Sequence, residues 1–386
     1  MDKRMNRDSF VGKRLYFVTT GAGSRFQHDL WMVPGASGFL VGAAFPYAKD
    51  DIDEFLGFKA EKYCSREQAL QLAMEAYMRA RRAPSGEAIG LAVTAAVASV
   101  DGPPRRGDHR IFVAVVSANG GYVLQRTLEK NPGFGSRQRQ SDNDVANLYA
   151  EDLLRIVLGE WTLEQAIDAN SIGHVAEATI ERVKESELLG LFFKHPFFGQ
   201  GGGRGSQDPA TMEVFYPGTF DPLHDGHRHI MHNVGTSNAC YVVNVDSVHK
   251  PEMSIIQILD IAAQFRTERL EWRNGAVLFT HGEPLFVNKF KKRTEKTFVV
   301  GVDTLERMLD PKWGVDPNNV LKSIYDNGVQ LYVCDRIVDG VHKKAVEAIK
   351  RLVPADRRRI APQFYPMDVE PSDLSSSEIR ATRNGT

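Results

Sequence analysis

The sequence has few cysteines, no long apolar run and almost no net charge. Its three cysteines, Cys64, Cys240 and Cys334, lie far apart, are odd in number and show no C-x-x-C spacing. Neither a disulfide framework nor a zinc site is therefore indicated. The charged N-terminus leads only into the short apolar run Leu15 to Val18, which is too brief for a signal-peptide core or a membrane span. We expect a protein of a reducing compartment, the cytoplasm.

Charge does not indicate a macromolecular partner. The 48 basic and 49 acidic residues give a formal net charge of −1 and form no long run of either sign. Neither a basic stripe for nucleic acid nor a polybasic membrane patch stands out. We expect small-molecule substrates, with no nucleic-acid and no membrane partner. A homo-oligomer is left open.

Length and one glycine-rich segment predict two domains. The 386 residues exceed the ~250 to 300 beyond which a single core usually splits. The segment from Phe198 to Pro209 has the glycine content of a flexible linker. We expect an α/β domain over residues 1–165, a helical segment and linker over 166–212, and a second α/β domain over 213–386.

The first of these domains alternates strands with helices. The residues predict strands over 15–18, 89–98 and 111–118, and a helix over 65–82 with Ser65 as its N-cap. Apolar residues also recur at helical spacing over 144–158, 162–169 and 175–189. This order indicates an α/β layered domain that ends in helices.

The most informative segment is Tyr-Pro-Gly-Thr-Phe-Asp-Pro-Leu-His-Asp-Gly-His at 216–227. The β-branched and aromatic residues of 212–216 favour a short buried strand, which Pro217 and Gly218 should break. Residues 228–234 lack breakers and favour a helix. A strand, a glycine turn and a helix start in this order point backbone N–H groups and a helix dipole at a phosphate. Gly226, between His224 and His227, would let a ligand come close.

Near the C-terminus, Leu374-Ser375-Ser376-Ser377-Glu378-Ile379-Arg380 contains a second phosphate-binding pattern. Ser375 followed three residues later by Glu378 forms a capping box, so a helix should begin there with free N–H groups. Arg380 follows with a planar guanidinium suited to phosphate oxygens.

Weaker candidates lie between these two motifs. Residues 297–304 form a buried-strand run that ends in Gly301 and Asp303. Lys250 follows a second predicted strand over 240–246 and could reach a substrate phosphate.

These motifs resemble those of the nucleotidyltransferase superfamily, which transfers AMP or CMP from a nucleoside triphosphate and releases pyrophosphate. Residues 216–227 resemble its H-x-G-H loop, 374–380 its I-S-S-T-x-I-R motif, and 297–304 the G-x-D element of nicotinamide-nucleotide adenylyltransferases. The resemblance implies a Rossmann-like, doubly wound parallel sheet of the HUP type over about 213–383, with His224, His227 and Arg380 as catalytic residues. It also implies nucleotide contacts from Gly218, Thr219, Phe220, Asp221, Gly226, Lys250, Gly301, Asp303, Ser375, Ser376 and Ser377.

The implied reaction needs no covalent intermediate. A phosphate oxygen of the acceptor attacks the α-phosphorus of ATP in line, while the protein supplies positioning and positive charge. Each histidine either donates as a neutral tautomer or gains charge beside the triphosphate. Mg²⁺ would arrive with ATP and bridge its phosphates; we expect no dedicated protein metal ligands.

The first half resembles the C-terminal domain of the CinA family, which includes nicotinamide mononucleotide deamidases. The matching stretches are 20–23, 33–37 with Gly42 and Tyr47, 90–94 and 110–114. The position of the family's nucleophilic serine falls on Thr20, and that of its lysine falls on Ile52. A threonine hydroxyl without a base or cation within reach is a poor nucleophile. Lys49 would substitute only if the loop is shifted, so we expect deamidase activity to be lost.

Together the two resemblances favour adenylyl transfer to nicotinamide or nicotinate mononucleotide, with formation of a dinucleotide. Three other interpretations remain: a pantetheine-phosphate adenylyltransferase, a CTP-dependent cytidylyltransferase, and a nucleotide-sensing scaffold without turnover. A class I aminoacyl-tRNA synthetase also has an H-x-G-H loop, but no K-M-S-K-S element follows it here.

Overall fold

The structure is a computed structural model. It describes residues 5–83, 85–99, 107–130, 135–166, 178–194, 211–236, 238–246, 251–271, 276–338, 340–353, 363–367, 369 and 379. Contacts between residues divide the chain into two compact units. The first unit comprises Met1–His195 with Ser254–Ala263, and the second comprises Pro196–Met253 with Gln264–Thr386. Each unit contains one six-stranded sheet with helices, so the protein has a two-domain α/β fold.

The first sheet is mixed, with strand order β2-β1-β3-β4-β5-β6. Its strands are β1 (Lys13–Thr20), β2 (Leu40–Ala44), β3 (Glu87–Ala96), β4 (His109–Ser117), β5 (Gly120–Leu128) and β6 (Ala178–Val183). β1 pairs in parallel with β2 and β3, whereas the pairs from β3 to β6 are antiparallel. Both faces are covered, so β3 and β4 are nearly continuous runs of buried residues.

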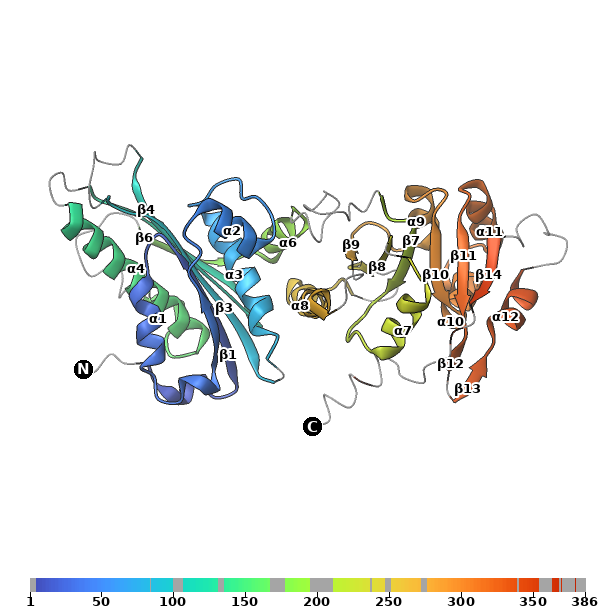
Figure 1. The fold of residues 1–386 in the computed structure, drawn as a ribbon, viewed down its shortest axis with the longest axis horizontal. Helices are drawn as coiled ribbons and strands as arrows, with labels where there is room; N and C mark the ends of the chain where they lie inside the picture. Colours follow the sequence, from blue (N-terminus) through green and yellow to red (C-terminus); the bar gives the residue numbers. More distant parts are fainter. Residues whose placement is uncertain are drawn as a thin grey trace. The chain divides into compact units, whose positions relative to one another are not determined.

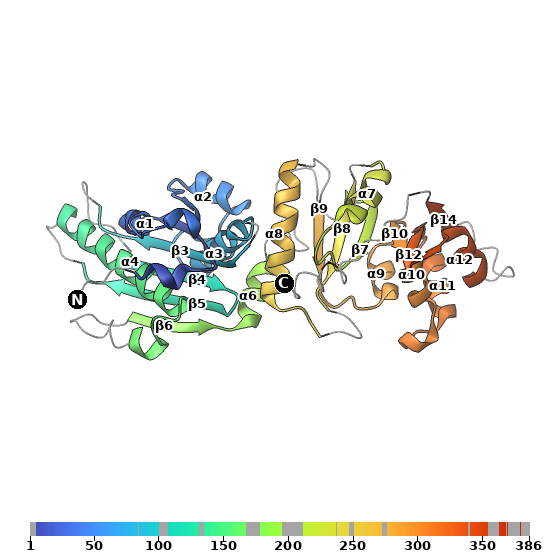
Figure 2. The same ribbon diagram turned by 90° about the horizontal axis from the view of Figure 1, so that it is seen from below.

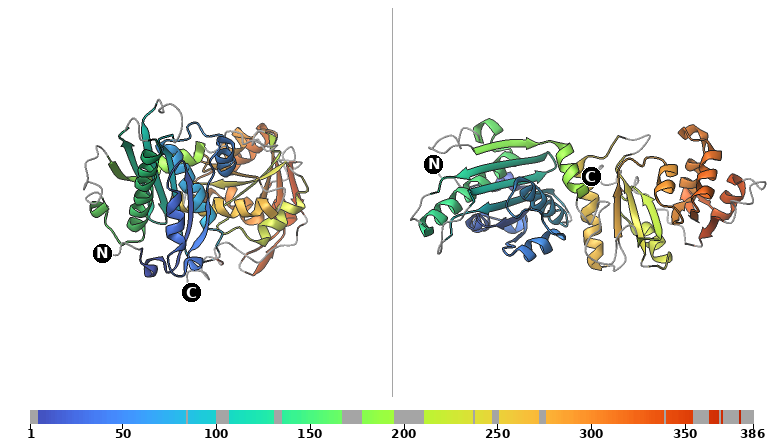
Figure 3. Two further views of the ribbon diagram at one scale, coloured as in Figure 1. Left: turned by 60° about the vertical axis from the view of Figure 1, so that its left-hand side comes forward. Right: turned by 90° about the horizontal axis from the view of Figure 1, so that it is seen from above.

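Helices cover the two faces of this sheet. They are α1 (Ser24–Trp31), α2 (Lys49–Leu56), α3 (Arg66–Ala80), α4 (Gly135–Val157) and α6 (Glu185–Lys194), with short 3₁₀ turns η1 (Arg7–Phe10) and η2 (Ala36–Gly38). Figure 1 shows α1 and α4 on one side of the sheet and α2 and α3 on the other. Turned views of the same layers are given in Figure 3.

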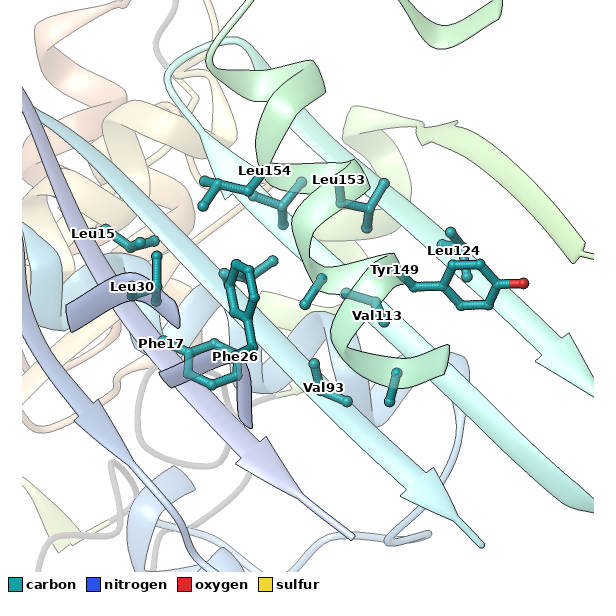
Figure 4. Close-up of a cluster of buried hydrophobic side chains, with 14 of the residues drawn as sticks. Leu15, Phe17, Phe26, Leu30, Val93, Val113, Leu124, Tyr149, Leu153 and Leu154 are labelled. Carbon is teal, nitrogen blue, oxygen red and sulfur yellow. The ribbon is translucent and has the colours of Figure 1, made fainter. Parts of the chain in front are cut away.

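The core between the sheet and the layer of α1 and α4 is apolar and closely packed. Figure 4 shows side chains of the strands, such as Phe17 and Val113, meeting Phe26 of α1 and Leu153 of α4. The rings of Phe17 and Phe26 lie edge to face with centroids 5.3 Å apart. Ile89 and Leu91 of β3 point into this core. Since successive strand residues point to opposite faces, Gly90 between them faces α3.

The second sheet is wholly parallel, with strand order β14-β11-β10-β7-β8-β9. Its strands are β7 (Val214–Gly218), β8 (Ala239–Asn244), β9 (Ala276–Thr280), β10 (Thr297–Gly301), β11 (Gln330–Cys334) and β14 (Phe364–Met367). The chain adds β8 and β9 on one side of β7, then crosses over and adds β10, β11 and β14 on the other. This is the order of a doubly wound Rossmann-like sheet, as the sequence predicts.

Helices and one small hairpin complete the second unit. They are α7 (Asp225–Asn233), α9 (Phe286–Lys292), α10 (Val302–Met308), η4 (Pro311–Trp313), α11 (Pro317–Asp326), α12 (Ala345–Leu352) and the hairpin of β12 (Arg336–Val338) and β13 (Val341–Lys343). Helix α8 (Ile255–Glu271) is shared: its residues up to Ala263 belong to the first unit and the later ones to the second. Figure 2 shows α10, α11 and α12 around β10 and β14. Their apolar side chains share one buried cluster with β7, β10 and β11. In the described part of the chain, no helix is long and apolar enough to cross a membrane.

Most elements expected from the sequence are present, with two corrections. The helix capped by Ser65 is confirmed, because the Ser65 side chain accepts a hydrogen bond from the Gln68 N–H. The helical spacing over 175–189 is misleading: residues 178–183 form β6, which pairs with β5, and α6 begins only at Glu185. The predicted break at Pro217 is also wrong, since β7 continues to Gly218. The glycine-rich segment 198–209 lies outside the described residues.

The close approach of β3 to α3 gives a first prediction. A Cβ on Gly90 would lie 2.1 Å from the Ala73 carbonyl oxygen and 2.2 Å from the Tyr77 nitrogen. We expect Gly90→Ala to lower the free energy of unfolding of the first unit by about 1–3 kcal/mol, because backbone atoms of α3 must move to make room for the methyl group. Urea unfolding followed by circular dichroism would measure this. Gly190→Ala is the matched control, because nothing lies within 4 Å of a Cβ at that helical position; an equal loss there would contradict the packing argument.

Candidate functional site

The candidate site lies where the second sheet changes direction. β7 pairs with β8 as far as Gly218, opposite Val243, but it pairs with β10 only through Val214 and Phe215. The carboxyl ends of β7 and β10 therefore separate. In open parallel sheets, ligands bind at such a switch point, beyond the carboxyl ends of the strands.

The loop that follows β7 is shaped by one buried aromatic side chain. Phe220 is 1% exposed and has a φ of 50°, in the left-handed region that non-glycine residues rarely adopt. A Cβ on Gly218 would lie 2.5 Å from the Phe220 ring, so only glycine fits beneath it. The Phe220 ring also meets, edge to face, the rings of Tyr216, His227, Tyr241 and Phe265 at centroid distances of 5.3, 4.9, 5.0 and 5.9 Å. The sequence-predicted loop residues Thr219 and Asp221 flank this anchor.

The two histidines of the loop are buried against each other. His224 is the N-cap of α7, and His227 lies in its first turn. Their ring centroids are 3.7 Å apart, and the backbone N–H of His224 donates to Nδ1 of His227 over 3.4 Å. Gly226, also buried, lies between them. Both ring nitrogens of His224 are buried without a hydrogen-bond partner.

Burial keeps both imidazoles neutral. Removal from water is the largest cause that lowers the pKa of His227, to about 3, and the neighbouring His224, Arg336 and Arg228 lower it further. The pKa of His224 is also lowered, by burial first and then by Arg336 and Arg228, with Asp225 acting in the opposite direction. At neutral pH each ring can thus donate one hydrogen bond but carries no charge.

Arg336, which the sequence motifs do not indicate, brings positive charge to this pair. It follows β11 by two residues, and Cys334 at the end of β11 pairs with Gly301 at the end of β10. Its Nε lies 3.5 Å from Oδ1 of Asp303. A Cβ on Gly301 would lie 2.9 Å from that Nε and 2.7 Å from that Oδ1, so this glycine lets both side chains cross the strand end. The signal available in the sequence is its place just after the apolar run 331–334, which forms β11.

Asp303 contributes a carboxylate to the site. Its Oδ2 accepts a hydrogen bond from Arg307 over 2.7 Å, whereas its Oδ1 is buried without a hydrogen-bond partner. Within the part of the chain that the structure describes, no three His, Cys, Asp or Glu side chains are grouped to hold a metal ion. Magnesium carried by a nucleotide needs only one or two carboxylates, and Asp303 fits that requirement.

The structure therefore places the loop residues, both histidines, Gly301 and Asp303 at the carboxyl edge of one sheet. Lys250, Ser375, Ser376, Ser377 and Arg380, which the sequence also indicates, lie outside the described residues.

In the first unit, an asparagine side chain accepts hydrogen bonds from the loop after β1. Thr20 ends β1 and is 5% exposed. Asn143 of α4 accepts hydrogen bonds through Oδ1 from the N–H groups of Gly23, over 2.9 Å, and Ser24, over 3.4 Å. The start of α1, where backbone N–H groups would otherwise meet an anion, is thus taken by a neutral amide.

The two positions that the sequence offers for the family's lysine are 52 and 49. Ile52 is 2% exposed and packs as a core residue of α2. The Nζ of Lys49 lies 5.3 Å from the centroid of the Tyr63 ring.

Comparison with known proteins finds similar solved structures only. No family model matches the chain, and no curated protein matches it. The competence/damage-inducible protein CihA of Agrobacterium tumefaciens is 20% identical, with a TM-score of 0.30, and the match covers 39% of this chain and 87% of that one. CinA-superfamily proteins of Escherichia coli and Klebsiella pneumoniae are each 12% identical, with TM-scores of 0.31 and 0.32. The Escherichia coli match covers 39% of this chain and 83% of that protein, and the Klebsiella pneumoniae match covers 40% of this chain and 91% of that protein.

The neutral histidine pair predicts a dependence of stability on pH. The pKa of His227 falls from an ordinary 6.5 to about 3 on folding, so the unfolded chain binds the proton more tightly. The stabilisation by a neutral ring is complete above about pH 6.5 and is lost as the pH falls towards 3. We expect the free energy of unfolding of the second unit to fall more steeply over this range in the wild type than in His227→Gln.

Urea titrations at a series of pH values would measure this difference. His229→Gln, at an exposed position of the same helix, is the matched control and should keep the wild-type slope. Identical slopes for the wild type and His227→Gln would contradict a buried neutral imidazole.

Proposed function

We propose that the second unit is an adenylyltransferase. It would transfer AMP from ATP to a phosphate-bearing acceptor, nicotinamide or nicotinate mononucleotide, and release pyrophosphate. The product would be a dinucleotide, which assigns the protein to NAD synthesis or salvage. The choice of acceptor rests on the two sequence resemblances. The site geometry supports the class of reaction.

One observation carries the proposal: buried polar atoms at the switch point lack hydrogen-bond partners. Both ring nitrogens of His224 and Oδ1 of Asp303 have no hydrogen-bond partner. Leaving such a group unsatisfied costs about 1–3 kcal/mol, so native structures rarely retain several together unless a ligand or water completes them. A nucleotide supplies both kinds of partner, because phosphate oxygens accept from imidazole N–H groups and ribose hydroxyls donate to a carboxylate.

These residues can perform the transfer without acid–base chemistry. The start of α7 directs backbone N–H groups towards the triphosphate, and neutral His224 and His227 donate to its oxygens. An oxygen of the acceptor phosphate forms a bond to the α-phosphorus. The bond from that phosphorus to the oxygen bridging the α- and β-phosphates breaks, and its electron pair leaves with pyrophosphate. Asp303 would be the carboxylate that holds the Mg²⁺ bound to ATP, and the metal would neutralise phosphate charge there.

For the first unit we propose a ligand-binding or structural role without deamidase turnover. The hydrogen bonds from Gly23 and Ser24 to Asn143 support this, since an oxyanion formed at Thr20 would compete with the asparagine for those N–H groups. Ile52 provides no cation for the hydroxyl.

Pyrophosphate release tests the proposal. The full chain is incubated with Mg²⁺ and either ATP or CTP, against nicotinamide mononucleotide, nicotinate mononucleotide and phosphopantetheine, and the products are separated by chromatography. We expect NAD or its nicotinate analogue from ATP. Product from phosphopantetheine or from CTP would move the protein to a sister activity. Nucleotide binding without any turnover would favour a sensing scaffold.

Substitution of the inner histidine should remove most of the activity. We expect His227→Ala to lower turnover by at least ~100-fold, the scale of losing a hydrogen-bond donor to the transition state. His229→Ala, an exposed change on the same helix, should leave turnover within a factor of about two, since surface changes usually have small effects. Near-wild-type turnover by His227→Ala would place the chemistry elsewhere.

A further inference from the structure

The strongest unassigned feature is the guanidinium of Arg336. Arg336 is the first residue of β12, and the stem and Nε of its side chain lie over Gly301 at the end of β10. Burial is the main cause that lowers the pKa of both His224 and His227, and the charge of Arg336 lowers both further. Among the described residues, neither of its terminal nitrogens has a hydrogen-bond partner. Two strong donors are therefore available beside the candidate phosphate site.

Charge balance gives these donors a purpose. Negative charge moves onto the leaving pyrophosphate during adenylyl transfer and must be neutralised by the site. Because burial keeps His224 and His227 uncharged, the histidines supply hydrogen bonds but no net charge. A cation from another part of the chain is required in addition to the magnesium of ATP.

The other arginine near the pair among the described residues, Arg228, is less suited to this role. Arg228 of α7 forms an ion pair with Asp225 over 2.7 Å, so its charge is already offset within its own helix. Arg336 shares its only ion-pair partner among the described residues, Asp303, with Arg307. The Arg307 bond to Asp303 is short, 2.7 Å, whereas the Arg336 contact is 3.5 Å. Asp303 therefore positions Arg336 without neutralising it fully.

We propose that Arg336 is a catalytic residue of the second unit, whose guanidinium contacts the triphosphate and neutralises charge on the departing pyrophosphate. This inference rests on the proposed adenylyl transfer. Arg336 moves no proton and forms no covalent bond. Its planar pair of terminal N–H groups fits two phosphate oxygens at once, which a lysine does not reproduce.

A purely structural role is the competing explanation, because Arg336 also joins the β12–β13 hairpin to α10 through Asp303. Arg307→Gln provides the matched control: it removes the stronger ion pair of the same carboxylate, from a side chain that is 60% exposed. Arg307 is not among the charges that shift the pKa of either histidine. A role through Asp303 alone would make Arg307→Gln at least as damaging as Arg336→Gln.

Steady-state pyrophosphate release by the full chain tests the inference. We expect Arg336→Gln to lower kcat by about 10²–10³-fold, Arg336→Lys to recover only part of that loss, and Arg307→Gln to stay within about threefold of the wild type. Retention of kcat by Arg336→Gln, or an equal loss in Arg307→Gln, would overturn the assignment while leaving the adenylyltransferase proposal intact.

A second readout needs no turnover. In the described part of the chain, the titratable and charged groups that face the two imidazoles are Tyr216 from β7, Asp225 and Arg228 from α7, and Arg336. Removing the Arg336 charge should raise the pKa of both histidines, which proton NMR of their C2–H resonances can follow, while Arg307→Gln should leave both unchanged. Unmoved histidine resonances in Arg336→Gln would contradict its placement.

Calorimetric titration with Mg·ATP separates failure of the inference from failure of the proposed function. If the wild type releases no pyrophosphate but binds Mg·ATP, and Arg336→Gln binds it at least tenfold more weakly, the phosphate contact stands and the transferase proposal falls. If the wild type neither binds Mg·ATP nor turns over, both fall.

Discussion

The backbone pairing of β7 is unequal on its two sides. Towards β8 it extends through Gly218, whereas towards β10 it ends at Phe215. The strand order explains this difference. The chain passes from β7 to β8 and β9 on one side, and then crosses over to β10 on the other side of β7. Every polar group of the candidate site is brought to the resulting gap by a strand end: the histidine loop by β7, Asp303 by β10 and Arg336 by β11. Without this reversal of strand order, these three segments would have no reason to meet.

The parts of the site that are formed by residues close together in the sequence could be predicted from it. The strand, glycine turn and helix that contain His224 and His227 lie within one short segment, and local rules describe such segments well. Arg336 could not be found in this way, since its proximity to His224 depends on which strands are adjacent. The charge state of the histidines was also beyond reach, because burial sets it and a sequence motif does not record burial.

The fold shows the same division between local and long-range effects. Helix α3 has a local signal, the Ser65 cap, and it forms where the sequence predicts. Residues 178–183 have helix-like apolar spacing, yet they form a strand because β5 offers an edge with which to pair. In the first unit, the identities of Thr20 and Ile52 can be read from the sequence. The contribution of Asn143 is not, because α4 reaches the loop after β1 only in the folded domain.

Phe220 has a consequence for how the nucleotide loop behaves before any ligand arrives. A left-handed conformation costs a bulky residue about 1–2 kcal/mol, and here four surrounding rings offset that cost. The packing of the Phe220 ring therefore fixes the conformation of the loop. Its shape is set when the protein folds, and a ligand that enters loses little of its binding free energy to ordering the backbone.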